Sequence, residues 1–188
     1  MAPIILKRSD FKSDAHLFLK LKSSVFIYPT DTIYGIGCDA TNADLVKRIR
    51  DIKQRQDQPF SVLVPTKEWI ISHCQIAFFA KEYLNKIPGP YTLLLDCSAS
   101  VANNLNPNGS VLGVRMIDSW FQDIVRELGF PIVTTSANRT GNPFMTSIAD
   151  IDKVVFDGVD FIIDDGELQC TPSTIIDLSG DEVRIIKR

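Results

Sequence analysis

The sequence predicts an α/β layer fold with a single buried core. Short runs rich in β-branched residues alternate along the chain with longer segments whose apolar residues recur at helical spacing. At 188 residues and 45% hydrophobic composition, the chain can build one core but is short for two ordinary domains. Because no internal repeat or low-complexity tract divides it, we expect one domain over residues 1–188.

Eight apolar runs bounded by turn residues are expected to form the strands. Each is short and rich in Val, Ile, Leu, Phe or Tyr, as residues buried in a sheet usually are. The predicted strands cover residues 25–28, 60–64, 91–95, 111–115, 132–135, 161–163, 174–178 and 183–186.

Four helices are expected between these strands. The first follows Thr41 and Asp44, which can form a capping box, and its apolar residues recur at helical spacing until it ends just before Lys53. Proline and glycine residues supply stop signals after the second and third helices. The remaining predicted helices cover residues 76–86, 120–128 and 148–156.

Charge and the N-terminus restrict the setting in which the protein works. A formal net charge of −3 gives no overall positive field of the kind that holds a nucleic-acid backbone. The N-terminal apolar run has only a few residues, too few for a signal peptide or a membrane-spanning helix. We therefore expect a cytoplasmic protein with no membrane partner.

The four cysteines predict neither a zinc site nor a disulfide framework. Cys38, Cys74, Cys97 and Cys170 form no CxxC pair, and no histidine stands at ligand spacing from them. We expect free thiols in a reducing compartment.

Four segments beside predicted strands concentrate small, hydroxylic or basic residues, as ligand sites of α/β folds do. They cover residues 28–39, 53–60, 114–115 and 134–143. Lys53 and Arg55 can hold a polyphosphate, Arg115 can pair with a carboxylate, and the last segment can cradle phosphate. Each segment also has an ordinary explanation: a hydrogen-bonded turn, solvated charges, or a structural salt bridge from Arg115 to an aspartate.

Several common catalytic and nucleotide-binding motifs do not occur in the sequence. It contains no GxxxxGK[ST], no GxGxxG and no GxSxG, which argues against a Walker site, a Rossmann site and a serine hydrolase. The histidines, His16 and His73, fall in regions expected to be helical, away from the four segments. A bound nucleotide must therefore be held by another arrangement.

Six segments, taken in order, resemble the YrdC/TsaC family, the threonylcarbamoyl-AMP synthases. They are YPTDTIYGIGCDATN at 28–42, KQR followed by PFSVLV at 53–64, PGPYTLLL at 88–95, VLGVRM at 111–116, TTSANRTGNP at 134–143 and PSTIIDLSG at 172–180. One such segment would carry little information, but six in the family's order at compatible spacing carry the resemblance. It extends from about residue 20 to residue 188.

The resemblance implies a fold, a reaction and partners. The fold is a YrdC-like twisted sheet of parallel and antiparallel strands, with flanking helices and a positively lined concave cleft, in its short single-domain form. The reaction is adenylyl transfer: a nucleotidyltransferase converts L-threonine, bicarbonate and ATP to threonylcarbamoyl-AMP and pyrophosphate, for threonylcarbamoyladenosine modification of tRNA. Mg²⁺ is expected with ATP rather than in a protein metal site. A downstream threonylcarbamoyl transferase acting on tRNA is the expected partner, and weak RNA contact is left open.

The resemblance also implies which residues form the site. L-Threonine is expected to contact Thr32, Arg115 and Ser173. ATP is expected to contact Lys53, Arg55, Gln58, Ser136, Asn138 and Lys187, with Lys53 and Arg55 as the catalytic residues. Gln58, Cys170 and the IIKR ending depart from the residues usual in the family at those places.

Two other functions stay open at this stage. A basic concave surface on this fold could bind double-stranded RNA or tRNA, although the acidic overall charge argues against it. The chain could also be a non-catalytic or carbamoyl-handling paralogue, similar to the related domain of hydrogenase-maturation carbamoyltransferases.

Overall fold

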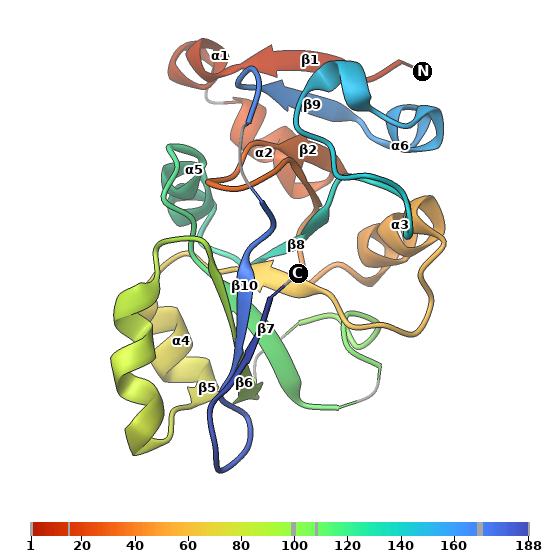
Figure 1. Ribbon diagram of the computed structural model, residues 1–188. Helices are drawn as coiled ribbons and strands as arrows, with labels where there is room; N and C mark the ends of the chain where they lie inside the picture. The colour runs from red at the N-terminus through yellow and green to blue at the C-terminus, as the bar shows by residue number, and fades with distance from the viewer. Residues whose placement is uncertain (1, 15, 99–100, 108, 169–170, 188) are drawn as a thin grey trace.

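Strands and helices alternate along the chain in the computed structural model, which describes residues 2–14, 16–98, 101–107, 109–168 and 171–187 (Figure 1). The strands are β1 (Ile4–Lys7), β2 (Phe26–Tyr28), β3 (Gly35–Gly37), β4 (Ser61–Leu63), β5 (Cys74–Gln75), β6 (Tyr91–Cys97), β7 (Val111–Arg115), β8 (Ile132–Ser136), β9 (Phe161–Asp164), β10 (Thr174–Asp177) and β11 (Arg184–Ile186). The helices are α1 (Arg8–Ser13), α2 (His16–Lys22), α3 (Ala43–Lys53), α4 (Lys67–His73), α5 (Phe121–Leu128) and α6 (Lys153–Gly158), with 3₁₀ segments η1 (Phe78–Lys86) and η2 (Ile148–Asp150). In the described part of the chain, no helix has the length and apolar character needed to cross a membrane.

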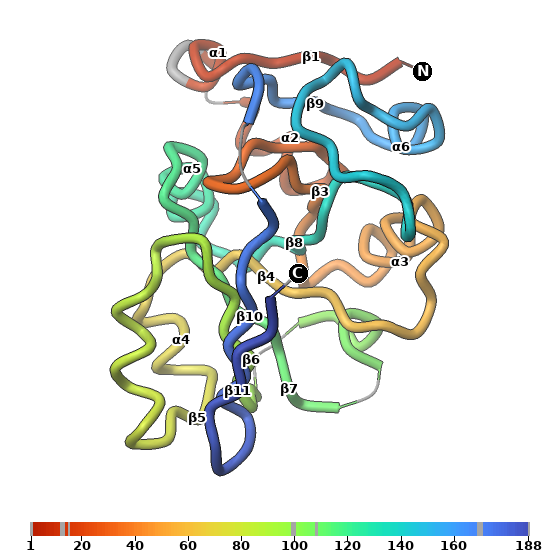
Figure 2. The backbone as a smooth tube through the Cα atoms, in the orientation of Figure 1, coloured from red at the N-terminus to blue at the C-terminus, as the bar shows by residue number. Residues whose placement is uncertain are grey.

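The strands join in one mixed sheet. Within the described residues their order is β1-β9-β2-β3-β8-β4-β7-β6-β10-β11, and β5 pairs with β6 off this path. Strand β4 runs parallel to β7, whereas β6 runs antiparallel to β7. Figure 2 shows β1 and β9, which are far apart in the sequence, lying side by side as a parallel pair. The expected mixed parallel and antiparallel sheet is confirmed.

Two buried clusters hold the helices against the sheet. Helices α2 and α5 contribute to an aromatic-rich cluster, in which the rings of Tyr28 and Phe121 stack with their centroids 4.7 Å apart. Helices α3 and α6 contribute Val46, Ile49 and Val155 to the other cluster. Because removing apolar surface from water is the main favourable term in folding, these clusters unite strands from both ends of the chain.

All eight predicted strands occur, with ends that differ by at most two residues. The sequence does not predict β1, β3 or β5, because β1 lies largely exposed at the sheet edge, β3 contains two glycines, and β5 has two residues. It also does not predict α1, α2 or α4. In α2, Leu17, Leu19 and Leu21 alternate as in a strand, but Leu19 is exposed and the other two are buried at helical spacing.

Three predicted helices need correction. The first is capped by Asn42 rather than Thr41: the Asn42 side chain accepts from the backbone nitrogen of Leu45 at 3.2 Å, while the Thr41 hydroxyl donates to Asp39. This helix also includes Lys53 as its last residue. The predicted helices at 76–86 and 148–156 are replaced by η1 and by η2 followed by α6.

The expectation of free thiols is wrong for two cysteines. Cys74 on β5 and Cys97 on β6 form a disulfide, and the antiparallel register places them directly opposite each other. A separation of 23 residues gives no hint of this pairing, because it arises from the sheet. Cys38 is buried and free, and Cys170 lies outside the described residues.

We predict that Gly37→Ala lowers the free energy of unfolding by about 1–3 kcal/mol, the usual cost of overpacking. A methyl group at Gly37 would overlap the backbone oxygen of Val133 and crowd the Tyr28 ring and a methyl group of Ile132. Gly180 has no heavy atom within 4 Å of the same position, so Gly180→Ala is the matched control and should change stability little. Urea unfolding measures both variants, and equal stabilities would contradict the packing argument.

Candidate active site

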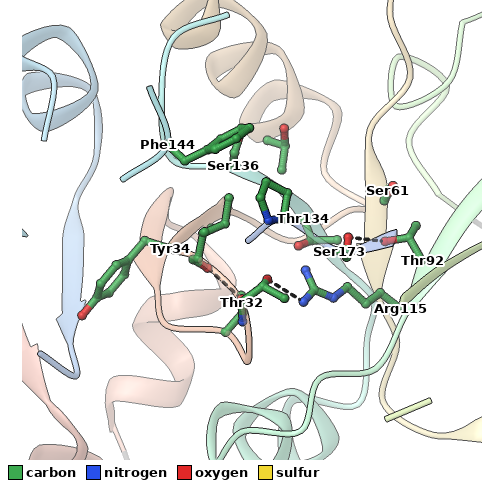
Figure 3. A pocket seen from close by; sticks show the side chains of 14 residues that line it. Thr32, Tyr34, Ser61, Thr92, Arg115, Thr134, Ser136, Phe144 and Ser173 are labelled. Atoms are coloured by element: carbon green, nitrogen blue, oxygen red, sulfur yellow. Dashed lines mark hydrogen bonds between the residues drawn. The ribbon is translucent and has the colours of Figure 1, made fainter. Parts of the chain in front are cut away.

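One pocket opens where the loop after β2 meets the inner strands of the sheet (Figure 3). Its lining is dominated by hydroxyl groups, with one cationic side chain. The lining residues are Thr30, Thr32, Ile33, Tyr34, Gly35, Ser61, Thr92, Arg115, Thr134, Thr135, Ser136, Phe144, Pro172 and Ser173.

Sheet register brings these residues together. Strand β8 runs antiparallel to both β3 and β4, which places Ser136 opposite Gly35 and Thr134 opposite Ser61. The Thr92 hydroxyl on β6 lies 2.9 Å from that of Ser173, just before β10. Hydroxyl groups from distant parts of the sequence therefore converge on one small volume, which suits a small polar ligand.

The loop after β2 is fixed by its own threonines. The Thr30 hydroxyl lies 2.9 Å from the Thr32 hydroxyl and donates to the carbonyl of Ile33 at 2.7 Å. It also accepts from the backbone nitrogen of Thr32 at 3.0 Å. The segment is thus a hydrogen-bonded turn, which was the alternative to a ligand site for residues 28–39. The turn also directs Thr32 toward the pocket.

Arg115 ends β7 and lies almost fully buried in the pocket wall. Its Nη2 donates to the carboxylate of Asp31 and to the hydroxyl of Thr32, the latter at 2.8 Å. The structural salt bridge left open by the sequence therefore exists. Among the described residues, the buried Arg115 Nε has no hydrogen-bond acceptor. Because Arg115 lines the pocket and carries a positive charge in a largely buried wall, this side chain is suited to receiving an anion from the pocket.

Lys53 does not point into the pocket. It is buried at the end of α3, and its Nζ donates to the carbonyl oxygens of Ser136 and Asn138, each at 2.5 Å. Burial, with a smaller contribution from the charge of Arg55, lowers the pKa of Lys53 to about 7. Lys53 therefore ends α3 instead of lying in a loop, and the helix end directs its amine at the backbone after β8. Its contact with phosphate stays a prediction.

Arg55 and Asn138 lie in hollows next to the pocket. Arg55 donates to the carbonyl of Pro59 at 2.8 Å and lines a hollow of about 350 Å³ that shares Ser61 with the pocket. Asn138 lines a hollow of about 450 Å³ that shares Phe144 with the pocket. Within the described chain no donor reaches the buried Asn138 Oδ1. These hollows extend the site on two sides.

The structure brings together some of the predicted residues and not others. Thr32, Arg115, Ser173 and Ser136 share the pocket, and Arg55 and Asn138 flank it. The side chains of Gln58 and Lys187 are exposed and line none of these hollows. Nothing in the sequence singles out five further residues of the site: Asp31, Ser61, Thr92, Thr134 and Phe144. Asp31 and Thr134 fall in segments it noted, but only the strand register identifies Ser61 and Thr92 as pocket residues.

Comparison with known proteins gives a consistent set of relatives. The family model Sua5_yciO_yrdC, described as "Telomere recombination", matches residues 21–188. A putative threonylcarbamoyl-AMP synthase of Methanocaldococcus jannaschii is 34% identical over 177 residues, which cover 90% of this chain and 83% of the relative. A threonylcarbamoyl-AMP synthase of Idiomarina loihiensis is 28% identical over 151 residues, covering 77% and 81%.

A solved structure agrees with these sequence matches. P. abyssi Sua5 complexed with L-threonine has a TM-score of 0.84 and 28% identity, and the match covers 100% of this chain but 57% of that one. The chain thus spans a little over half the length of this Sua5. Since the family model covers nearly the whole chain and the archaeal relative matches along most of both lengths, the chain belongs to the Sua5/YciO/YrdC family.

Proposed function

We propose that this chain is a threonylcarbamoyl-AMP synthase, a nucleotidyltransferase that forms threonylcarbamoyl-AMP and pyrophosphate from L-threonine, bicarbonate and ATP. One observation carries the proposal: a buried arginine with an unpaired donor shares a pocket with convergent hydroxyl groups. This combination fits a small amino acid that has both a carboxylate and a hydroxyl. The names of the relatives support the same reaction.

The proposed chemistry needs positioning more than a protein nucleophile. The threonine amine adds to the carbon of bicarbonate and water leaves, which gives N-carboxythreonine. A carbamate oxygen then attacks the α-phosphorus of ATP, the bond to the bridging oxygen breaks, and pyrophosphate leaves. Holding the two reactants together and neutralising phosphate charge supplies most of the rate enhancement for such a step.

In the proposed threonine subsite, Arg115 pairs with the carboxylate while Thr32 and Ser173 bind the polar side chain. The Ser173 hydroxyl contacts Thr92, and Thr32 contacts Arg115, so both hydroxyls are already oriented. An apolar amino acid cannot add a hydrogen bond to these groups, and each hydrogen bond that is lost costs about 0.5–1.5 kcal/mol of binding free energy. The subsite should therefore prefer threonine over valine.

In the proposed nucleotide subsite, Ser136 contacts the phosphates from the pocket, and Arg55 and Asn138 contact them from the two flanking hollows. Lys53 contributes indirectly in this proposal. Its hydrogen bonds to the carbonyls of Ser136 and Asn138 fix the backbone that carries those two side chains. Gln58 and Lys187 remain proposed contacts on the solvent side of the nucleotide.

Magnesium is proposed as a companion of ATP. The described residues contain no group of three or more His, Cys, Asp or Glu side chains placed to hold a metal ion. We propose that phosphate oxygens and water coordinate Mg²⁺ when ATP is bound. No step above is assigned to the ion.

The wider setting belongs to the same proposal. We infer a single YrdC-like domain over residues 1–188, a cytoplasmic location, and a downstream transferase that passes the threonylcarbamoyl group to tRNA. The net charge of −3 gives little support for strong RNA binding by this chain itself.

Purified protein should release pyrophosphate from ATP only when L-threonine, bicarbonate and Mg²⁺ are all present. Serine should support slower release and valine almost none, because valine cannot satisfy the pocket hydroxyls. A coupled pyrophosphate assay measures each rate. If folded protein shows no threonine-dependent release of pyrophosphate, the proposal is wrong. An RNA-binding module or a non-catalytic paralogue would then be favoured.

Arg115→Ala should raise the KM for threonine about tenfold or more, which corresponds to about 1.4 kcal/mol, and should change the KM for ATP much less. The reason is that Arg115 contacts the amino acid and not the nucleotide in the proposed site. Arg126→Ala, which removes an exposed arginine paired with Asp123, is the matched control. Equal increases in both KM values would show that the role assigned to Arg115 is wrong.

Lys53→Met should lower turnover and also remove a pH dependence of stability. Burial lowers the pKa of Lys53 from 10.5 to about 7, so between those pH values the unfolded chain binds more protons than the folded one. The free energy of unfolding of the wild type should therefore rise with pH across this window, relative to Lys53→Met. Denaturant unfolding at several pH values tests this, with the exposed Lys47→Met on the same helix as control. Parallel pH profiles for wild type and Lys53→Met would exclude the effect.

A further inference from the structure

We propose that Asp31 is a positioning residue for the amino-acid subsite, because it holds Arg115 in the orientation that receives the threonine carboxylate. This inference rests on the proposed function. It adds to that function a residue that contacts neither reacting atoms nor nucleotide in our account, and acts through Arg115.

Asp31 is held from two sides. One carboxylate oxygen accepts from Arg115 Nη2, and the other accepts from the backbone nitrogen of Asp118 at 3.0 Å. The side chains of Asp31 and Arg115 are only 8% and 7% exposed. The carboxylate therefore links the loop after β2 to the end of β7 and to the connection that follows it.

The contacts divide the donors of Arg115 into two sets. Nη2 is used by the protein, since it donates both to Asp31 and to Thr32. Among the described residues, no acceptor reaches Nε. The two hydrogens of Nη2 lie in the guanidinium plane, so two contacts from this nitrogen set the orientation of the plane and the position of the remaining donors. Figure 3 shows the Arg115 side chain pointing toward Thr32, with a dashed line for the hydrogen bond between them.

The charge of the buried Arg115 side chain also favours this role for Asp31. A buried cation without a partner is strongly disfavoured, and it would turn toward solvent or attract a stray anion. With Asp31 beside it, Arg115 belongs to a neutral pair that still has a free donor. Such a pocket favours an amino acid, which carries both charges, over a simple anion.

The test measures binding of L-threonine to the full chain by isothermal titration calorimetry without ATP. Asp31→Asn keeps the shape of the side chain but removes its charge, and it should weaken threonine binding about tenfold or more. The matched control is Asp160→Asn. Asp160 likewise accepts from a backbone nitrogen, that of Val25 at 2.8 Å, and from an arginine, Arg48 at 2.7 Å, but lines no part of the pocket. The control should bind threonine within twofold of the wild type.

A second measurement asks whether Asp31 acts through Arg115. NMR titration, which follows weak binding, is applied to Arg115→Gln with and without Asp31→Asn. If the aspartate only positions the arginine, adding Asp31→Asn to Arg115→Gln causes no further loss of affinity. Additive losses would show that Asp31 acts independently and would overturn the inference.

These outcomes distinguish a failure of the inference about Asp31 from a failure of the proposed function. Failure of the wild type to bind threonine would refute the proposed function. If the wild type binds and Asp31→Asn binds within twofold of it, or if Asp160→Asn loses as much affinity, Asp31 has no positioning role. If circular dichroism shows that Asp31→Asn does not fold, Asp31→Glu replaces it. Its longer side chain shifts the guanidinium and should still weaken binding about threefold or more, so unchanged affinity would overturn the inference.

Discussion

The pairing of β8 with both β3 and β4 is the constraint on which the rest of the structure depends. This strand joins the β1-β9-β2-β3 part of the sheet to the β4-β7-β6-β10-β11 part, and Ile132 and Val133 on it are fully buried. Because side chains alternate along a strand, a shift of one residue would turn the hydroxyl groups of Thr134 and Ser136 away from the pocket. The core and the site therefore share one register, and neither can change without the other.

The strands were predictable because each buried run is short, apolar and bounded by turn residues. The elements that the sequence analysis missed lack that signal. Strand β3 reads GIG, and its glycines are needed because Tyr28 and the backbone of Val133 leave no room for a side chain. The Cys74–Cys97 disulfide also lies beyond sequence reasoning, since it depends on which strands become neighbours. Helix α3 was predictable from its spacing, although the choice of Asn42 as its cap was not.

The site could be predicted in part. Family motifs pointed to Thr32, Arg115, Ser173 and Ser136, and the sheet gathers them around one pocket. The family motif also assigned Lys53 to the phosphates, but the direction of its side chain depends on the fold, and the last turn of α3 directs it at backbone carbonyls. Asp31 has no signal of its own, because many aspartates occur in this sequence and only the fold shows which of them meets the buried arginine.

The origin of the pocket residues bears on how such a site can evolve. Gly35, Ser61, Thr92, Arg115 and the 134–136 segment lie on five separate strands, not on one exchangeable loop. In folds whose ligand residues lie on surface loops, a new specificity can arise by inserting or replacing a loop. Here an insertion would disturb the sheet that forms the core. On these five strands, divergence of ligand preference is therefore confined to single replacements at fixed positions, whereas Thr32 and Ser173 lie in loops that can also change in length.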